Sequence, residues 1–177
     1  NFVWGPGGGL YMQESVFHNT QVETIYGPRR SKDNAIYRFD PQTHRLEIAS
    51  RLPPGGNPWG YAINQWGEHL YVGRHNNASL INQPESGNVA NANYGNRDNR
   101  NCGQEFISSR HWPDELQGKV FSNQYKNFQG VLIHDWTEKG TTYDHKRLGK
   151  VFEAQNKACI PVDLQLGPEG ALYVADW

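Results

Sequence analysis

Gly167-Pro168-Glu169-Gly170-Ala171-Leu172-Tyr173-Val174 is a glycine-containing turn that leads directly into a short aliphatic and aromatic strand. Related turns and strands occur at residues 5–11, 66–72 and, in a weaker form, 118–122. The copies are 60, 50 and 52 residues apart when measured between their aromatic residues, Tyr11, Tyr71, Phe121 and Tyr173. A repeat of roughly 40–50 residues, built from turns and short strands, is typical of a β-propeller blade.

The segments around these copies fit blades of four antiparallel strands, in which each repeated phrase joins the first strand to the second. We expect strands at residues 9–15, 35–39 and 45–48 in the first blade, and at 60–63 and 69–73 in the second. The third blade takes residues 105–108, 119–123, 131–135 and 149–152, and a fourth begins with 162–166 and 172–176. The sequence thus predicts an all-β propeller fragment of about three blades plus the start of another, where about six would close the ring.

Residues 74–103 interrupt this pattern, because they are crowded with Asn and contain few apolar side chains. They stand where the third and fourth strands of the second blade belong. Loops of this length are uncommon in compact domains and often serve a function. Two alternatives remain open: an Asn-rich insertion loop in a reduced blade, or two weak strands at residues 78–81 and 89–94.

The whole chain, residues 1–177, is expected to be one partial domain. Strand-like runs lie at both ends, at Phe2-Val3-Trp4 and at residues 172–177, so we expect a piece of a longer polypeptide, cut at both ends. Its first partner would then be the remaining blades of its own polypeptide. Unpaired blade faces are apolar and favour association.

Bulk composition excludes two classes of partner. The formal net charge is −1 and no stretch concentrates Lys and Arg, which argues against nucleic-acid binding. No apolar run approaches the roughly 20 residues that span a bilayer. We therefore expect no membrane-spanning segment here.

Antiparallel pairing indicates where polar side chains gather. The start of each first strand and the end of each second strand lie at the same edge of the sheet. That edge is expected to hold Asn57, Trp59 and Asp163 from the strand starts, and Glu14, His18, Arg74, His75, Gln124, Asp176 and Trp177 from the strand ends. A mouth of carboxylates, imidazoles, amides and indoles is the best candidate site in the sequence.

Five stretches together resemble a known family: FHNTQVETIYGPRR (17–30), AIYRFDPQTHRLEI (35–48), NPWGYAINQWG (57–67), ISSRHWPDELQG (107–118) and PVDLQLGPEGALYVADW (161–177). They are similar to the propeller domain of the planctomycete-type membrane-bound dehydrogenases. That domain is distantly related to the pyrroloquinoline-quinone (PQQ)-dependent glucose and sorbosone dehydrogenases. The resemblance covers most of the chain outside the Asn-rich segment.

The resemblance implies an extracytoplasmic, periplasmic oxidoreductase that acts on a sugar, polyol or related alcohol and passes electrons to a c-type cytochrome. The sequence contains no Cys-x-x-Cys-His, so any haem c would lie outside it. PQQ with Ca²⁺ is the cofactor the family suggests. The relatives commonly carry an Arg before the Asn that corresponds to Asn57, whereas this chain has Gly56, which weakens the case for PQQ. A non-catalytic propeller that binds carbohydrate or a protein partner is the alternative.

Within this hypothesis the candidate site residues take distinct roles. His75 and His18 are the candidate general bases, because abstracting hydride from an alcohol needs a base near neutral pH. Arg74, beside His75, favours the neutral imidazole, and Arg74, Asn57 and Trp59 are the candidate cofactor contacts. The alternatives are solvated loop histidines, and a turn at Asn57-Pro58 that only enters the strand.

Two further pairs have open alternatives. Asp163 and Asp176 could bind Ca²⁺ together with loop carbonyls, or accept hydrogen bonds from backbone amides near the centre of the propeller. Cys102 and Cys159 each precede a first strand of adjacent blades, close enough for a disulfide. They could also be unrelated thiols or link to a cofactor. The recurrent Trp and Tyr side chains are expected mainly to pack between blades.

Overall fold

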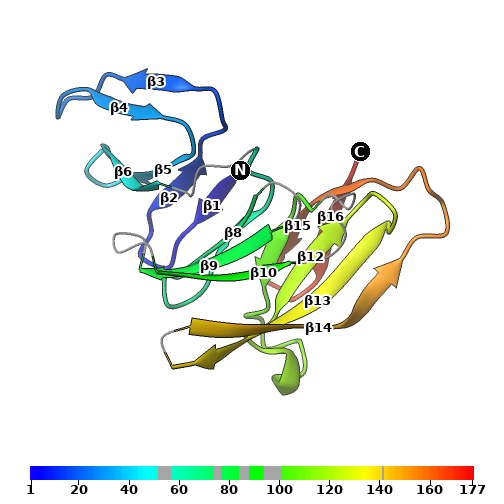
Figure 1. Cartoon of the computed structure of the whole chain (residues 1–177). Helices are drawn as coiled ribbons and strands as arrows, with labels where there is room; N and C mark the ends of the chain where they lie inside the picture. The colour runs from blue at the N-terminus through cyan, green and yellow to red at the C-terminus, as the bar shows by residue number, and fades with distance from the viewer. Residues whose placement is uncertain (52–56, 74–76, 84–87, 94–100, 141) are drawn as a thin grey trace.

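The computed structural model describes residues 1–51, 57–73, 77–83, 88–93, 101–140 and 142–177 (Figure 1). Within these residues the chain is all-β and contains no α-helix, and a short 3₁₀ turn, η2 (Asp114–Leu116), lies between two of its strands. No described helix is long and apolar enough to cross a membrane.

Three antiparallel sheets of four strands follow one another along the chain. The first sheet has the order β1 (Phe2–Trp4), β2 (Leu10–Gln13), β5 (Ala35–Asp40) and β6 (Arg45–Arg51). The second has β7 (Tyr61–Ile63), β8 (His69–Val72), β9 (Asn77–Gln83) and β10 (Asn88–Asn93). The third has β11 (Gln104–Phe106), β12 (Val120–Gln124), β13 (Gly130–Lys139) and β14 (Thr142–Glu153), and a terminal hairpin of β15 (Pro161–Leu166) and β16 (Leu172–Asp176) follows.

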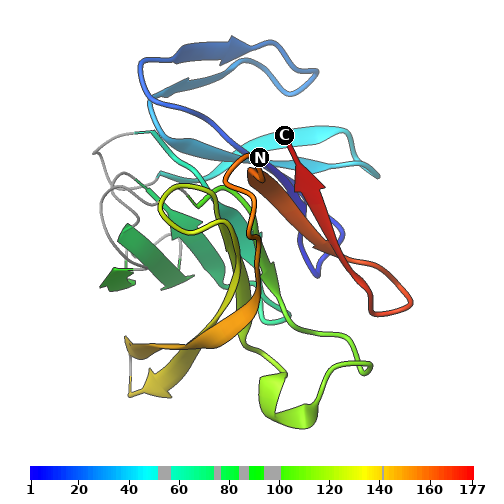
Figure 2. The same ribbon diagram turned by 90° about the vertical axis from the view of Figure 1, so that its right-hand side faces the viewer.

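The first strands of successive sheets lie side by side. Contacts link β1 to β7, β7 to β11, and β11 to β15, in chain order. The loops that join each first strand to its second, at residues 5–9, 64–68, 107–119 and 167–171, therefore gather at one edge, which we call the turn edge. Figure 2 shows the η2 loop and the β15–β16 turn on the lower side of the molecule. This arrangement is consistent with a β-propeller fragment.

The structure decides between the alternatives for the Asn-rich segment. Strands β9 and β10 pair with each other and β9 pairs with β8, so two strands lie within residues 74–103 instead of one long loop. Backbone pairing explains how a segment with few apolar residues joins the sheet, since ladder hydrogen bonds do not depend on side-chain type.

A hairpin that the sequence pattern did not predict leaves the first sheet between β2 and β5. It consists of β3 (Asn19–Val22) and β4 (Arg29–Lys32), and it projects from the rest of the molecule at the top of Figures 1 and 2. Buried Glu14 fastens its base: the carboxylate accepts hydrogen bonds from the Ser31 hydroxyl at 3.0 Å, the Ala35 N–H at 3.2 Å and the Thr20 hydroxyl.

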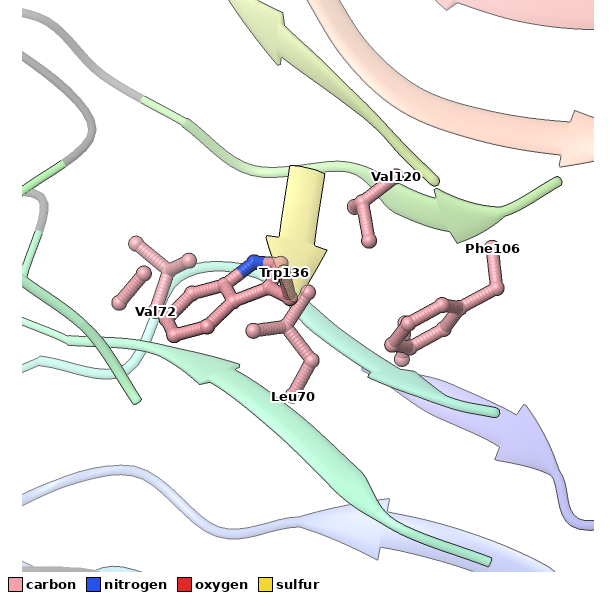
Figure 3. Packing of buried hydrophobic residues seen from close by; sticks show 7 residues of the cluster. Leu70, Val72, Phe106, Val120 and Trp136 are labelled. Atoms are coloured by element: carbon pink, nitrogen blue, oxygen red, sulfur yellow. The ribbon is translucent and has the colours of Figure 1, made fainter. Parts of the chain in front are cut away.

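Apolar side chains fill the spaces between neighbouring sheets. The cluster between the second and third sheets includes Leu70 and Val72 from β8, Phe106 from β11, Val120 from β12 and Trp136 from β13 (Figure 3). Leu70, Val72 and Val120 are fully buried. Burial of such a side chain contributes about 1.5–3 kcal/mol to the free energy of unfolding, so these clusters hold the sheets together.

One buried amide connects the third sheet to the terminal hairpin. The Asn123 Oδ1 atom accepts the backbone N–H groups of Cys102 at 2.9 Å and Gly103 at 2.7 Å, and its Nδ2 donates to the Pro161 carbonyl at 2.6 Å. Asn123 is fully buried. An Asn side chain offers two donors and an acceptor oxygen, so this one residue pairs three backbone groups at the starts of β11 and β15.

A buried histidine lies between the first and second sheets. The Nδ1 atom of His69 is 2.6 Å from the Tyr61 hydroxyl, and the Tyr11 ring meets the imidazole edge-on at a centroid distance of 5.1 Å. Burial lowers the pKa of His69 to about 4, because the charged imidazolium loses its hydration there. The folded protein therefore holds this residue neutral at physiological pH.

We expect the Asn123→Ala variant to lose about 3 kcal/mol of unfolding free energy, because the truncation leaves buried backbone groups unpaired at about 1–3 kcal/mol each. Urea denaturation measures this loss. Gln165→Ala, a change at an exposed position of β15, is the matched control and should change stability little. A loss for Asn123→Ala as small as that of the control would contradict the role assigned to this amide.

Acidification should destabilise the protein through His69. The unfolded state, whose imidazole has an ordinary pKa of about 6.5, takes up a proton between pH 6.5 and pH 4 that the folded state does not take up. The free energy of unfolding therefore falls by about 2 kcal/mol from this residue between pH 7 and pH 5.

The measurement is denaturant unfolding at pH 7 and at pH 5 for the wild type and for His69→Gln. The difference between the two pH values should shrink in the variant. Leu70→Ala, at a buried neighbouring position, is a control that lowers stability and keeps the pH difference. An unchanged pH difference in His69→Gln would show that the prediction is wrong.

Candidate functional site

A cleft of about 190 Å³ opens at the turn edge between the second and third sheets. Its lining combines aromatic rings with amide and carboxylate groups, chiefly Trp66, Phe106, Trp136, Tyr143, Glu68 and Gln117. We call it the stacking cleft. Rings together with convergent polar groups are the usual composition of a small-molecule site.

Trp66 is held at the cleft by a rigid turn. The Asn64 Oδ1 atom accepts the backbone N–H groups of Trp66 at 3.0 Å and Glu68 at 2.9 Å, and the Gly67 N–H donates to the Asn64 carbonyl at 3.0 Å. Asn side chains favour turns through bonds of this kind. Although its backbone is fixed in this way, Trp66 is 77% exposed, so the structure presents a large apolar ring to solvent.

Glu68 and Tyr143 join the two walls of the cleft. The Tyr143 hydroxyl on β14 donates to the Glu68 Oε1 atom, and the Asn64 amide donates to Oε2. Burial and the Glu68 carboxylate raise the pKa of the Tyr143 hydroxyl, so it stays a donor at neutral pH. These bonds tie the turn that carries Trp66 to the third sheet.

Gln117 contributes an acceptor to the same cleft. Its Nε2 atom donates to the carbonyls of Ser109 at 2.9 Å and Trp112 at 2.8 Å. Both amide protons are used in this way, and what the side chain can offer a ligand is its oxygen. The cleft can therefore stack a flat apolar face and accept hydrogen bonds beside it.

The strand-start edge, opposite the turn edge, contains the residues that the sequence singled out. The Ser15 hydroxyl, just after β2, donates to the Asn57 Oδ1 atom at 3.4 Å, so the end of a second strand and the start of the next first strand do meet. Asn57 is exposed, and Trp59 packs against the apolar cluster between the second and third sheets. The cofactor contacts assigned to Asn57 and Trp59 stay predictions.

The two candidate bases are not brought together in the described structure. His18 is exposed near the base of the β3–β4 hairpin, where its carbonyl accepts the Asp33 N–H at 3.0 Å. Arg74 and His75 lie outside the described residues. The catalytic roles of the histidines and the cofactor role of Arg74 therefore stay predictions.

Asp163 and Asp176 make backbone hydrogen bonds. The Asp176 Oδ1 atom accepts the Ile160 N–H at 2.5 Å, and the Asp163 Oδ1 atom accepts the Leu164 N–H at 2.9 Å. Both contacts match the alternative in which these carboxylates serve the backbone. Among the described residues, no group of three or more His, Cys, Asp or Glu side chains is placed to hold a metal ion.

Cys102 and Cys159 are both half-buried thiols, and no disulfide joins them in the structure. Asn123 explains how the neighbouring strand starts are held without such a bond, since its amide already connects Cys102 to Pro161. Burial and the nearby Asp176 carboxylate raise the pKa of the Cys159 thiol. In this structure the two residues are separate thiols, which is one of the alternatives that the sequence left open.

Sequence reasoning missed the stacking cleft because it treated the recurrent aromatic residues alike. Trp59, Trp112 and Trp136 do pack between sheets, as expected. Trp66 does not pack between sheets. The sequence signal that could have shown this is its place in Asn64-Gln65-Trp66-Gly67, a turn between two strands.

No model of a known protein family and no curated protein matches this chain.

Proposed function

We propose that the chain is part of a β-propeller that binds a neutral sugar or polyol in the stacking cleft, as a non-catalytic binding platform. The observation that carries this proposal is the exposed Trp66 ring, which stands beside polar acceptors on a turn whose backbone is fixed by hydrogen bonds. Exposure of an apolar ring to water is unfavourable, so a ligand that stacks on the ring and removes its surface from water lowers the free energy.

The frame of the proposal is a propeller of about six blades, to which this chain contributes three four-stranded blades and the start of another. The side-by-side first strands and the shared turn edge support it. The remaining blades of the same polypeptide are then its proposed partners. Propeller ligands generally bind at a rim of the ring, and the position of the stacking cleft at the turn edge of two neighbouring sheets supports a site of this kind.

The chemistry of the cleft favours a sugar over an apolar ligand. A pyranose has C–H groups on one face, which suit the negative face of an indole, and hydroxyls around its rim that donate to acceptors. Glu68, Glu138 and the Gln117 oxygen are acceptors at this site. The two carboxylates disfavour an anionic group in this cleft, so the sugar unit that stacks on Trp66 is expected to be uncharged.

Calorimetric titration with neutral mono- and oligosaccharides tests the proposal. We expect Trp66→Ala to raise Kd about tenfold, the effect of losing about 1.4 kcal/mol of stacking, while Trp66→Phe retains part of the affinity. Trp177→Ala is the matched control, because Trp177 is 87% exposed and does not line the cleft.

Two outcomes would contradict the binding platform. One is the absence of saturable binding, and the other is an equal loss of affinity in Trp66→Ala and Trp177→Ala. Reduction of an artificial electron acceptor by a bound sugar, in the presence of PQQ and Ca²⁺, would instead support the extracytoplasmic oxidoreductase and its cytochrome partner.

A further inference from the structure

A second cleft, of about 390 Å³, lies beside the stacking cleft on the turn edge. Its lining includes Glu105, the loop segment from Ser108 to His111, and the turn at Gly167. Ser108 lines both clefts, so the two adjoin at this residue. We call it the basic cleft, because its lining includes the Arg110 guanidinium with the His111 imidazole beside it in sequence.

The walls of the basic cleft are firmly packed. The Trp112 Nε1 atom donates to the Gly170 carbonyl at 2.8 Å, which joins the η2 loop to the β15–β16 turn. His111 packs directly on Gly170: a Cβ atom added to this glycine would lie 2.4 Å from the His111 Cβ. Gln117, which lines the stacking cleft, also holds the Ser109 carbonyl of the basic cleft. The same side chain therefore positions both sites.

The two clefts differ in charge. Glu68 and Glu138 line the stacking cleft, whereas Arg110 and His111 line the basic cleft. The acidic groups near the basic cleft are Glu105 within it, Asp163 beside Glu105, and Glu169, whose pKa is lowered chiefly by the Tyr173 hydroxyl and slightly by His111. Burial and Asp163 raise the pKa of Glu105 to about 7, so this carboxyl is about half protonated at neutral pH and repels an anion less.

We propose that the two clefts form one continuous groove for an acidic oligosaccharide. A neutral face of the chain stacks on Trp66, and the carboxylate of a neighbouring uronate unit is held by Arg110 and His111. This inference rests on the proposed sugar-binding function and narrows it to a polymer that carries carboxylates. Arginine suits the acidic position, because its planar guanidinium pairs with a carboxylate through two parallel hydrogen bonds.

The test compares two probes: a trisaccharide of two neutral hexose units and one uronate unit, and the same trisaccharide with its single carboxylate methyl-esterified, which removes the charge and adds one methyl group. Titration of the wild type should give an affinity for the acid form about five- to tenfold higher than for the ester, the size expected of a partly exposed charge-assisted pair. Arg110→Gln should remove this preference and leave the affinity for the ester unchanged. Lys32→Gln, an exposed change on the β3–β4 hairpin, is the control and should keep the preference.

The possible failures are distinguishable. Equal affinities for acid and ester in the wild type would overturn the acidic groove, and so would an unchanged preference in Arg110→Gln. If Trp66→Ala still weakens binding of the ester in these cases, the proposed sugar-binding function survives. If neither trimer binds, the acidic groove is wrong, and the titration with neutral saccharides decides the sugar-binding function by itself. If both trimers bind and Trp66→Ala weakens neither, both proposals are wrong. A monosaccharide that binds as tightly as the trimer would contradict the continuous groove alone.

Discussion

The hydrogen bonds of the Asn123 side chain set the distance between the third sheet and the terminal hairpin. They leave so little space that a Cβ atom added to Gly103 would lie 2.8 Å from the Asp163 Cα and Leu164 N atoms. Because β11 and β15 are held this closely, the loops that follow them also meet, and Trp112 can reach Gly170. The shape of the basic cleft at the turn edge therefore depends on the Asn123 amide, which lies at the opposite end of β11 and β15.

The two edges of the sheets use polar groups differently. At the strand-start edge, Asp176, Asn123 and Asn57 are engaged with backbone groups or with a neighbouring hydroxyl, which stabilises the junctions between sheets. At the turn edge, Asn64 and Gln117 also bind backbone groups, but in doing so they fix the loops that carry Trp66 and Ser109 at the two clefts. The same kind of bond thus joins neighbouring sheets at one edge and holds the loops that line the two clefts at the other.

The sequence predicted the elements whose turns and apolar alternation recur, such as β8, β12 and β16, to within a residue or two. It failed for β3 and β4, whose residues Asn19-Thr20-Gln21-Val22 and Arg29-Arg30-Ser31-Lys32 show no apolar alternation. Their position depends on Glu14, a contact between distant residues that no local pattern reveals. The rule that first-strand starts and second-strand ends share one edge correctly placed Asn57 near the end of β2. It did not find the stacking cleft, because exposure of Trp66 is decided by tertiary packing and not by residue type.

The β3–β4 hairpin has a consequence for how this chain tolerates change. Strand β2 pairs directly with β5, with Gln13 opposite Ile36, and the Glu14 N–H bonds to the Ala35 carbonyl at 2.8 Å. The chain thus leaves the first sheet after β2 and returns to it at β5 at neighbouring points. The register of the first sheet is complete without the β3–β4 hairpin. A change in the length of the hairpin should therefore leave the pairing of β2 with β5 unaltered. What such a change would loosen is the contact with β6, where Arg29 donates to the Leu46 carbonyl at 3.0 Å.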